Sequence, residues 1–165
     1  MKQTKKTPSP RANETRRQRR AAASLIERRK CANPKRRAEL EAAPAEWLRH
    51  YLHAAFPLPF GEVHLRMIEA AARAVETGSG MACAAPRGTG KSTVLWGVAL
   101  WALLSGRARF PVVEGWAHAA ARRMLRKWIS TLAENPRLAA DYPEATAPFW
   151  ESTHANRLKH TAWAD

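Results

Sequence analysis

The stretch whose residue types and spacing point most directly to chemistry is APRGTGKST, residues 85–93. It follows the pattern G-x-x-x-x-G-K-[ST], with alanine in place of the first glycine. Gly88 and Gly90 permit left-handed backbone conformations, which let successive amide N–H groups turn inward and form a nest for an anion. Lys91 would then contact the β- and γ-phosphates of a nucleotide, and the Ser92 hydroxyl would ligate Mg²⁺. The spacing predicts a phosphate-binding loop.

The predicted phosphate-binding loop also includes Arg87, Thr89 and Thr93. Thr89 lies between the two glycines of the nest, and Thr93 would donate a further hydrogen bond to a phosphate. Arg87 has two interpretations. It is a cation that stabilises charge at the γ-phosphate, as arginine fingers do, or a surface arginine paired with a nearby acid. The alternative for the whole stretch is an ordinary turn rich in small residues.

The segments around the loop predict a strand before it and a helix after it. Residues 81–85 read as a short buried strand, and residues 92–105 as an apolar helix. A second strand is predicted at residues 110–116, and an amphipathic helix follows over residues 117–132. This order predicts an α/β protein with a P-loop NTPase fold, a RecA-like parallel sheet with flanking helices, and ligand at the carboxyl ends of the strands.

Two further helices are predicted before the loop. Residues 44–56 place Trp47, Leu48 and Tyr51 on one face, and a proline stands at each end of the segment. Residues 62–76 form the second helix. After the proline at position 136 the patterns weaken, so that only loops, short helical turns and a final strand in the sequence TAWA are predicted.

The charge of the chain is concentrated at its start. The net charge is +14, and residues 1–37 hold 14 of the 28 Lys and Arg but only two of the 14 acidic residues. This composition predicts a disordered basic arm over residues 1–37, followed by a folded region over residues 38–165. A basic arm gains affinity for nucleic acid by releasing counterions, whereas the alternative is a solvated arm without a specific partner.

Cysteine content and hydropathy indicate a soluble protein of a reducing compartment. Two cysteines do not make a disulfide framework. The longest apolar run, residues 94–104, is about half of the roughly 20 residues that a membrane span requires. No association with a membrane is predicted.

The loop together with its surroundings resembles the large terminase subunits of bacteriophages, the ATPases that pump DNA into capsids. APRGTGKST is similar to the Walker A motif of this family, and the segments EWLRHYL, FPLPFGEVHLRMIEAA and ENPRLAADYPE are similar to its flanking regions. The similarity covers residues 44–165. It implies an ATP-binding portion of a DNA-packaging motor, with Lys91 and Ser92 at the phosphates and Mg²⁺, and with Arg87 acting at the γ-phosphate of its own subunit.

The resemblance also implies partners and a location. Large terminases act on double-stranded DNA with a small terminase subunit and a portal, as homo-oligomeric rings. The implied location is the cytoplasm of a phage-infected or prophage-carrying bacterium.

Several features of the family are absent from the sequence. An upstream glutamine commonly lies near the adenine, but here His64 or Phe60 would have to replace it, and core packing is the alternative for both. No apolar run ending in Asp-Glu, a Walker B strand, follows the loop. Asp141 and Glu144 fall in a proline-containing stretch, and the carboxylates of the nuclease domain are not found. The chain is therefore expected to be the front portion of such an ATPase, without the residues that complete catalysis.

The sequence is also compatible with two other functions. One is a different P-loop ATPase acting on DNA, of the helicase or replication type. The other is a non-enzymatic, basic DNA-binding remnant. His50 and His53 are spaced as metal ligands can be, although a solvated or packed pair is the simpler interpretation. The basic face formed by Arg122, Arg123, Arg126 and Lys127 is either solvated or contacts DNA or a neighbouring subunit.

Overall fold

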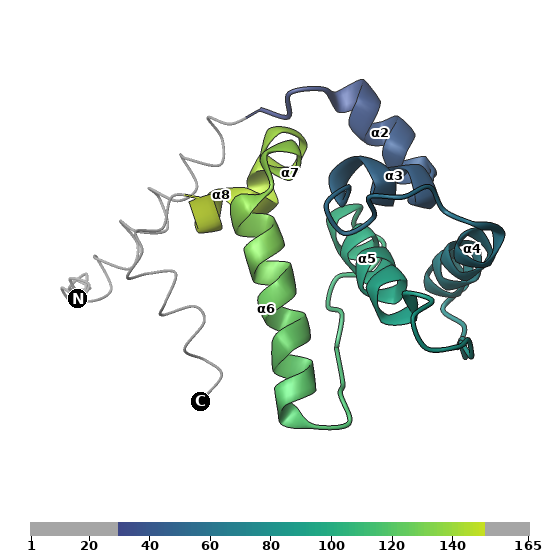
Figure 1. Cartoon of the computed structure of the whole chain (residues 1–165). Helices are drawn as coiled ribbons and strands as arrows, with labels where there is room; N and C mark the ends of the chain where they lie inside the picture. Colours follow the sequence, from purple (N-terminus) through teal and green to yellow (C-terminus); the bar gives the residue numbers. More distant parts are fainter. Residues whose placement is uncertain (1–29, 151–165) are drawn as a thin grey trace, which may run out of the picture.

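The computed structural model describes residues 30–150, and this part of the chain is built from helices (Figure 1). The helices are α2 (Pro34–Ala42), α3 (Pro44–Tyr51), α4 (Glu62–Thr77), α5 (Lys91–Leu104), α6 (His118–Glu134), α7 (Pro136–Asp141) and α8 (Pro143–Trp150). Residues 161–164, for which the sequence predicts a final strand, lie outside the described part.

The predicted parallel sheet is wrong for the described residues, because neither expected strand is one. Residues 81–85 and 110–116 run without regular secondary structure and make no backbone–backbone hydrogen bond with any other described residue. Phe110 is 86% exposed, Val112 70% and Trp116 93%, so the second segment is not a buried strand either. A strand depends on the ladder of a neighbouring strand, and the described chain supplies none. The prediction of a RecA-like α/β fold is therefore wrong, and the described residues form a helical fold.

The predicted helices are confirmed, with small shifts at their ends. α3 begins at Pro44 but ends at Tyr51, earlier than expected. α4 ends where Gly78 adopts a left-handed conformation with φ of +67°, the common conformation after the last turn of a helix. The amphipathic helix after the second extended segment is α6, and α7 and α8 supply the short helical turns expected after it.

α5 lies at the centre of the core. Its buried residues point to several sides of the helix, and they are Val94, Trp96, Gly97, Val98, Leu100, Trp101 and Ala102. α3 and α4 pack against it from one side. The approach of α3 is close at Gly97, where a Cβ atom would lie 3.1 Å from the side chain of Leu48. A helix that is apolar on most of its surface is stable only when other elements cover it.

The long helix α6 stands beside α5 and is connected to it by the extended stretch that holds residues 110–116 (Figure 1). Trp128 joins the two helices, because its indole Nε1–H donates to the backbone oxygen of Trp96 at 3.3 Å. Both indoles are more than 90% buried, as is Trp101. All three tryptophans therefore belong to the core.

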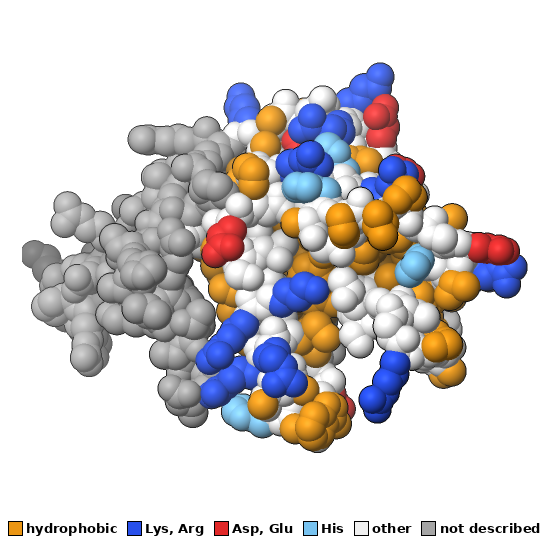
Figure 2. All heavy atoms as spheres, in the orientation of Figure 1, with side chains coloured by type: hydrophobic (Ala, Val, Ile, Leu, Met, Phe, Trp, Pro, Cys, Tyr) orange, Lys and Arg blue, Asp and Glu red, His pale blue; other side chains and the backbone are white. Residues whose placement is uncertain are grey.

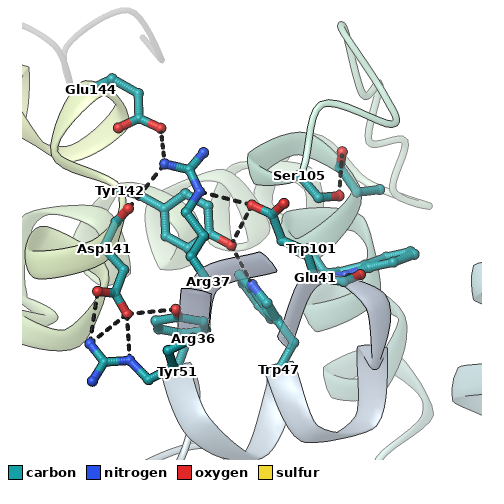
Figure 3. A network of polar contacts seen from close by, with 11 residues as sticks. Arg36, Arg37, Glu41, Trp47, Tyr51, Trp101, Ser105, Asp141, Tyr142 and Glu144 are labelled. Atoms are coloured by element: carbon teal, nitrogen blue, oxygen red, sulfur yellow. Dashed lines mark hydrogen bonds and ion pairs between the residues drawn. The ribbon is translucent and has the colours of Figure 1, made fainter. Parts of the chain in front are cut away.

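A buried carboxylate connects the two ends of the described chain (Figure 3). The Asp141 side chain at the end of α7 is fully buried, and Arg36 of α2 donates to its two oxygens from Nη2 and Nε at 2.8 and 3.0 Å. The Tyr51 hydroxyl of α3 donates to the same carboxylate at 2.8 Å. Burial alone raises the pKa of Asp141, but these donors outweigh it, so that the pKa lies below its ordinary 3.8.

A second set of contacts continues this network on the other side of α2. Arg37 pairs with Glu41 at 2.9 Å and with Glu144 of α8 at 2.7 Å. The Tyr142 hydroxyl donates to Glu41 at 3.0 Å and accepts from the indole N–H of Trp47 at 2.9 Å (Figure 3). α2 is therefore fastened to α7 and α8 by charge-assisted hydrogen bonds.

The position of α2 bears on where the basic arm ends. Residues 34–37, assigned to the arm on composition, form the first turn of this helix. The Asn33 side chain caps the helix by accepting from the Arg36 amide at 2.9 Å. Arg36 and Arg37 are thus structural ion-pair partners.

Replacing the buried carboxylate should destabilise the fold strongly. In Asp141→Asn the guanidinium of Arg36 loses its countercharge, and we expect the free energy of unfolding in urea at pH 7 to fall by about 3 kcal/mol. Because the pKa of Asp141 is lowered in the folded state, its contribution is present above the ordinary pKa and is lost as the pH falls through the folded-state pKa. The difference between wild type and variant should therefore shrink in acid.

Glu144→Gln is the matched control. It removes a carboxylate that also pairs with an arginine of α2 but is 46% exposed, so a loss below about 1 kcal/mol is expected. Equal losses in the two variants at pH 7 would show that the buried pair has no special role.

Candidate phosphate-binding loop

The predicted loop turns sharply into the N-terminus of α5. Gly88 and Gly90 have φ angles of +86° and +70°, the left-handed conformations that their positions in the motif suggested. α5 begins directly afterwards, at Lys91. The alanine at the first motif position, Ala85, has no positive φ, since every described residue with positive φ is a glycine. The missing first glycine therefore causes no backbone strain here.

The amide N–H groups of this turn are unpaired. Those of residues 88–93 donate to no carbonyl or side chain of the described chain. Gly88, Gly90 and Ser92 are exposed, so solvent reaches the turn. Free N–H groups in the first turn of a helix, together with the positive end of the helix dipole, are the usual components of an anion site.

The loop is held in shape by its own side chains. The Lys91 ammonium folds back and donates to the backbone oxygens of Ala85 and Pro86, the latter at 2.8 Å. The Thr89 hydroxyl donates to the Pro86 oxygen at 2.8 Å. These hydrogen bonds use the backbone oxygens at the start of the loop as acceptors. They do not involve the amide N–H groups of residues 88–93.

His64 ties the loop to the start of α4. Its Nδ1 accepts from the amide of Gly61, and its Nε2 lies 3.2 Å from the backbone oxygen of Thr89. With Nδ1 used as an acceptor, the neutral ring carries its proton on Nε2 and donates it to Thr89. His64 is a candidate replacement for an adenine-binding glutamine on sequence grounds, but in the structure its Nε2 is bonded to the loop at Thr89 and its Nδ1 to Gly61 at the start of α4. Phe60 packs against His64 and Phe56.

The other predicted residues of the loop are placed as follows. Arg87 is exposed and forms no ion pair with an acid of the described chain. Ser92 lies in the first turn of α5 with its hydroxyl accessible, and Thr93 is half-buried. All the residues proposed to bind nucleotide thus lie together in one turn, with Lys91 directed at carbonyl groups.

No carboxylate within residues 30–150 forms an ion pair or hydrogen bond with the loop. Asp141 and Glu144 are engaged by the arginines of α2, as described above. Within residues 30–150, no three His, Cys, Asp or Glu residues are grouped as a metal site would require. His50 and His53 therefore belong to no such group. Mg²⁺ commonly takes one or two protein ligands together with substrate phosphates and water. Ser92 fits this role for a metal brought in with a triphosphate, but no described residue fits the role of a catalytic carboxylate.

A cavity of about 640 Å³ begins where the loop ends. Thr93 is the last residue of the loop and also lines this cavity, together with Trp96 of α5 and with Lys127 and Thr131 of α6. The Lys127 ammonium lies 4.1 Å from the centre of the Trp96 ring, and burial lowers its pKa. Sequence reasoning missed this cavity, because it depends on how α5 and α6 are placed in space.

Lys and Arg side chains gather over α6 (Figure 2). Arg123 and Arg126 are exposed, whereas Arg122 and Lys127 are half-buried, so the expected basic face is only partly solvated. Among the described helices none is long and apolar enough to cross a membrane.

Comparisons of the chain with protein families, curated proteins and solved structures found no match. The assignment of the loop therefore depends on its own geometry and on the sequence resemblance given above.

The left-handed conformation of Gly90 can be tested by adding a single methyl group. A Cβ atom at Gly90 would meet no atom within 4 Å, so any cost of Gly90→Ala comes from the backbone conformation alone. We expect the free energy of unfolding to fall by about 1–2 kcal/mol, measured by urea titration.

Gly80→Ala provides the comparison, because Gly80 also has open space around it but no positive φ. Its effect should stay within about 0.5 kcal/mol. A Gly90→Ala variant as stable as Gly80→Ala would contradict the turn geometry on which the site is built.

Proposed function

We propose that residues 85–93 bind the phosphates of a nucleoside triphosphate, ATP with Mg²⁺. The observation that carries this proposal is the run of amide N–H groups over residues 88–93 that donate to no described residue, at the N-terminus of α5 and with the Lys91 ammonium beside it. A triphosphate would supply acceptors for these donors and a countercharge for the lysine. Ser92 would hold the metal, which neutralises part of the phosphate charge.

Binding requires Lys91 to change partners. In the structure its ammonium donates to the oxygens of Ala85 and Pro86, both at the start of the same loop. A phosphate oxygen is a stronger acceptor for an ammonium group than a neutral carbonyl is. The lysine would therefore rotate toward the amide side when a triphosphate arrives, while the His64 anchor keeps Thr89 in place.

The proposal stops at binding for this chain. Hydrolysis of ATP needs a carboxylate that holds the metal and a group that orients water. Asp141 and Glu144, the acids considered for such a role, are fixed in ion pairs with Arg36 and Arg37. We therefore expect ATP hydrolysis by this chain alone to stay at background.

The wider role that we propose is that of the ATP-binding portion of a terminase-like DNA-packaging motor. It is supported by the resemblance of the loop and of the ENPRLAADYPE stretch. Double-stranded DNA is the proposed partner, because residues 1–29 alone carry ten Lys and Arg against two acids. Contact with a small terminase subunit and a portal, and assembly into a ring, belong to the same proposal.

Removing the loop lysine tests the binding site. In Lys91→Ala we expect the affinity for ATP and for inorganic tripolyphosphate, measured by calorimetry with Mg²⁺ present, to fall at least about tenfold, because the variant cannot form the charge-assisted hydrogen bond to phosphate. Lys35→Ala serves as the control, since Lys35 is a solvent-exposed lysine on α2. If Lys91→Ala and Lys35→Ala bound ATP and tripolyphosphate with equal affinity, the proposal that the loop binds phosphates would be wrong.

Removing the basic arm tests the DNA partner. The deletion should comprise residues 2–29, which leaves the Arg36 and Arg37 ion pairs intact. We expect the deletion to weaken binding to double-stranded DNA. We also expect the slope of log K against log salt to become shallower by about 0.9 for each phosphate that the arm neutralises in the full chain. An unchanged salt slope would show that the arm does not contact DNA phosphates.

A further inference from the structure

The cavity between α5 and α6 adjoins the loop at Thr93. Its volume is about 640 Å³, within the range of roughly 300–1,000 Å³ that small-molecule sites occupy. Thr93 belongs to both features, and Trp96 lies one helical turn further along α5. Two other cavities of the described part, of about 470 and 350 Å³, share no residue with the loop.

We infer that this cavity holds the ribose and base of the nucleotide whose phosphates lie on the loop. The inference rests on the proposed function, since it extends that site from the phosphates to the nucleoside. A ligand that spans both regions would pass Thr93, the one residue that they share.

The walls of the cavity suit a flat, partly apolar group. Leu52, Ala55 and Pro136 supply apolar surface from the turn after α3 and from the start of α7. Trp96 lines the same space and is 3% exposed, so it forms a rigid part of the wall. A base can be buried against such surfaces, and the buried Trp96 indole N–H, which has no hydrogen-bond partner among the described residues, is the one buried, unpaired polar group of this wall.

The polar groups of the cavity suit a sugar and the phosphate next to it. The Lys127 ammonium is held over Trp96 and forms no ion pair with an acid of the described chain. This half-buried cation is available to the phosphate nearest the nucleoside. Glu134 lies two turns further along α6 and also lines the cavity. Its carboxylate forms no described ion pair, and ribose hydroxyls are the donors that such a group accepts from.

The experiment separates the nucleoside from the phosphates by comparing ATP with inorganic tripolyphosphate. Calorimetry of the full chain in Mg²⁺ should show tighter binding of ATP to the wild type. Thr131→Trp places an indole in the cavity, and we expect it to weaken ATP about tenfold or more and to leave tripolyphosphate unchanged. Glu134→Ala removes an exposed carboxylate and should therefore destabilise the fold less than Thr131→Trp. It should lower the affinity for ATP several-fold, again without an effect on the affinity for tripolyphosphate.

Ala119→Trp is the matched control, because it adds an indole to the same helix at an exposed position that lines none of the three cavities described above. It should alter neither affinity, and circular dichroism should show the same helix content in all variants. The inference is overturned if the wild type binds ATP and tripolyphosphate equally, if Thr131→Trp and Glu134→Ala leave ATP binding unchanged, or if they weaken both ligands alike. If the wild type binds neither ligand, the proposed function itself fails and the inference fails with it.

Discussion

Helix α5 carries apolar side chains around most of its circumference, so it can exist only with other helices on several sides. α3 and α4 cover it through close contacts such as Leu48 on Gly97, and α6 reaches it through Trp128. The loop of residues 85–93 is attached to the N-terminus of this buried helix. The proposed phosphate site would therefore be carried by a deeply packed helix of the described chain, although the loop itself faces solvent.

The helices could be predicted from the sequence because their signals are local. Pro44, the apolar spacing of α4 and the glycine after it act within a few residues, and the structure follows them. The absence of strands at residues 81–85 and 110–116 could not be predicted in this way. A short apolar run forms a strand only if a neighbouring strand pairs with it, and that neighbour is not a property of the run itself. The expected sheet failed for this reason.

The site was predictable to a similar extent. The spacing of Gly88, Gly90 and Lys91 located the turn, and the positive φ angles of both glycines agree with it. The roles of His64 and Asp141 could not be read from sequence, because their partners Thr89 and Arg36 lie 25 and 105 residues away. The cavity beyond Thr93 likewise depends on the packing of α6 against α5.

The contact between Lys91 and the carbonyl oxygens of residues 85 and 86 has a consequence for which anions the turn can select. The loop already contains a cation with satisfied hydrogen bonds, so an incoming anion would compete with two internal acceptors. The free energy of breaking those bonds is the same for every anion, whereas the attraction to the ammonium grows with the anion's charge. At the proposed phosphate site, chloride or a monoanionic phosphate ester would gain little from this exchange, and a polyvalent chain of phosphates would gain most. The hydrogen bonds of the lysine would thus make the proposed site discriminate among anions by valence.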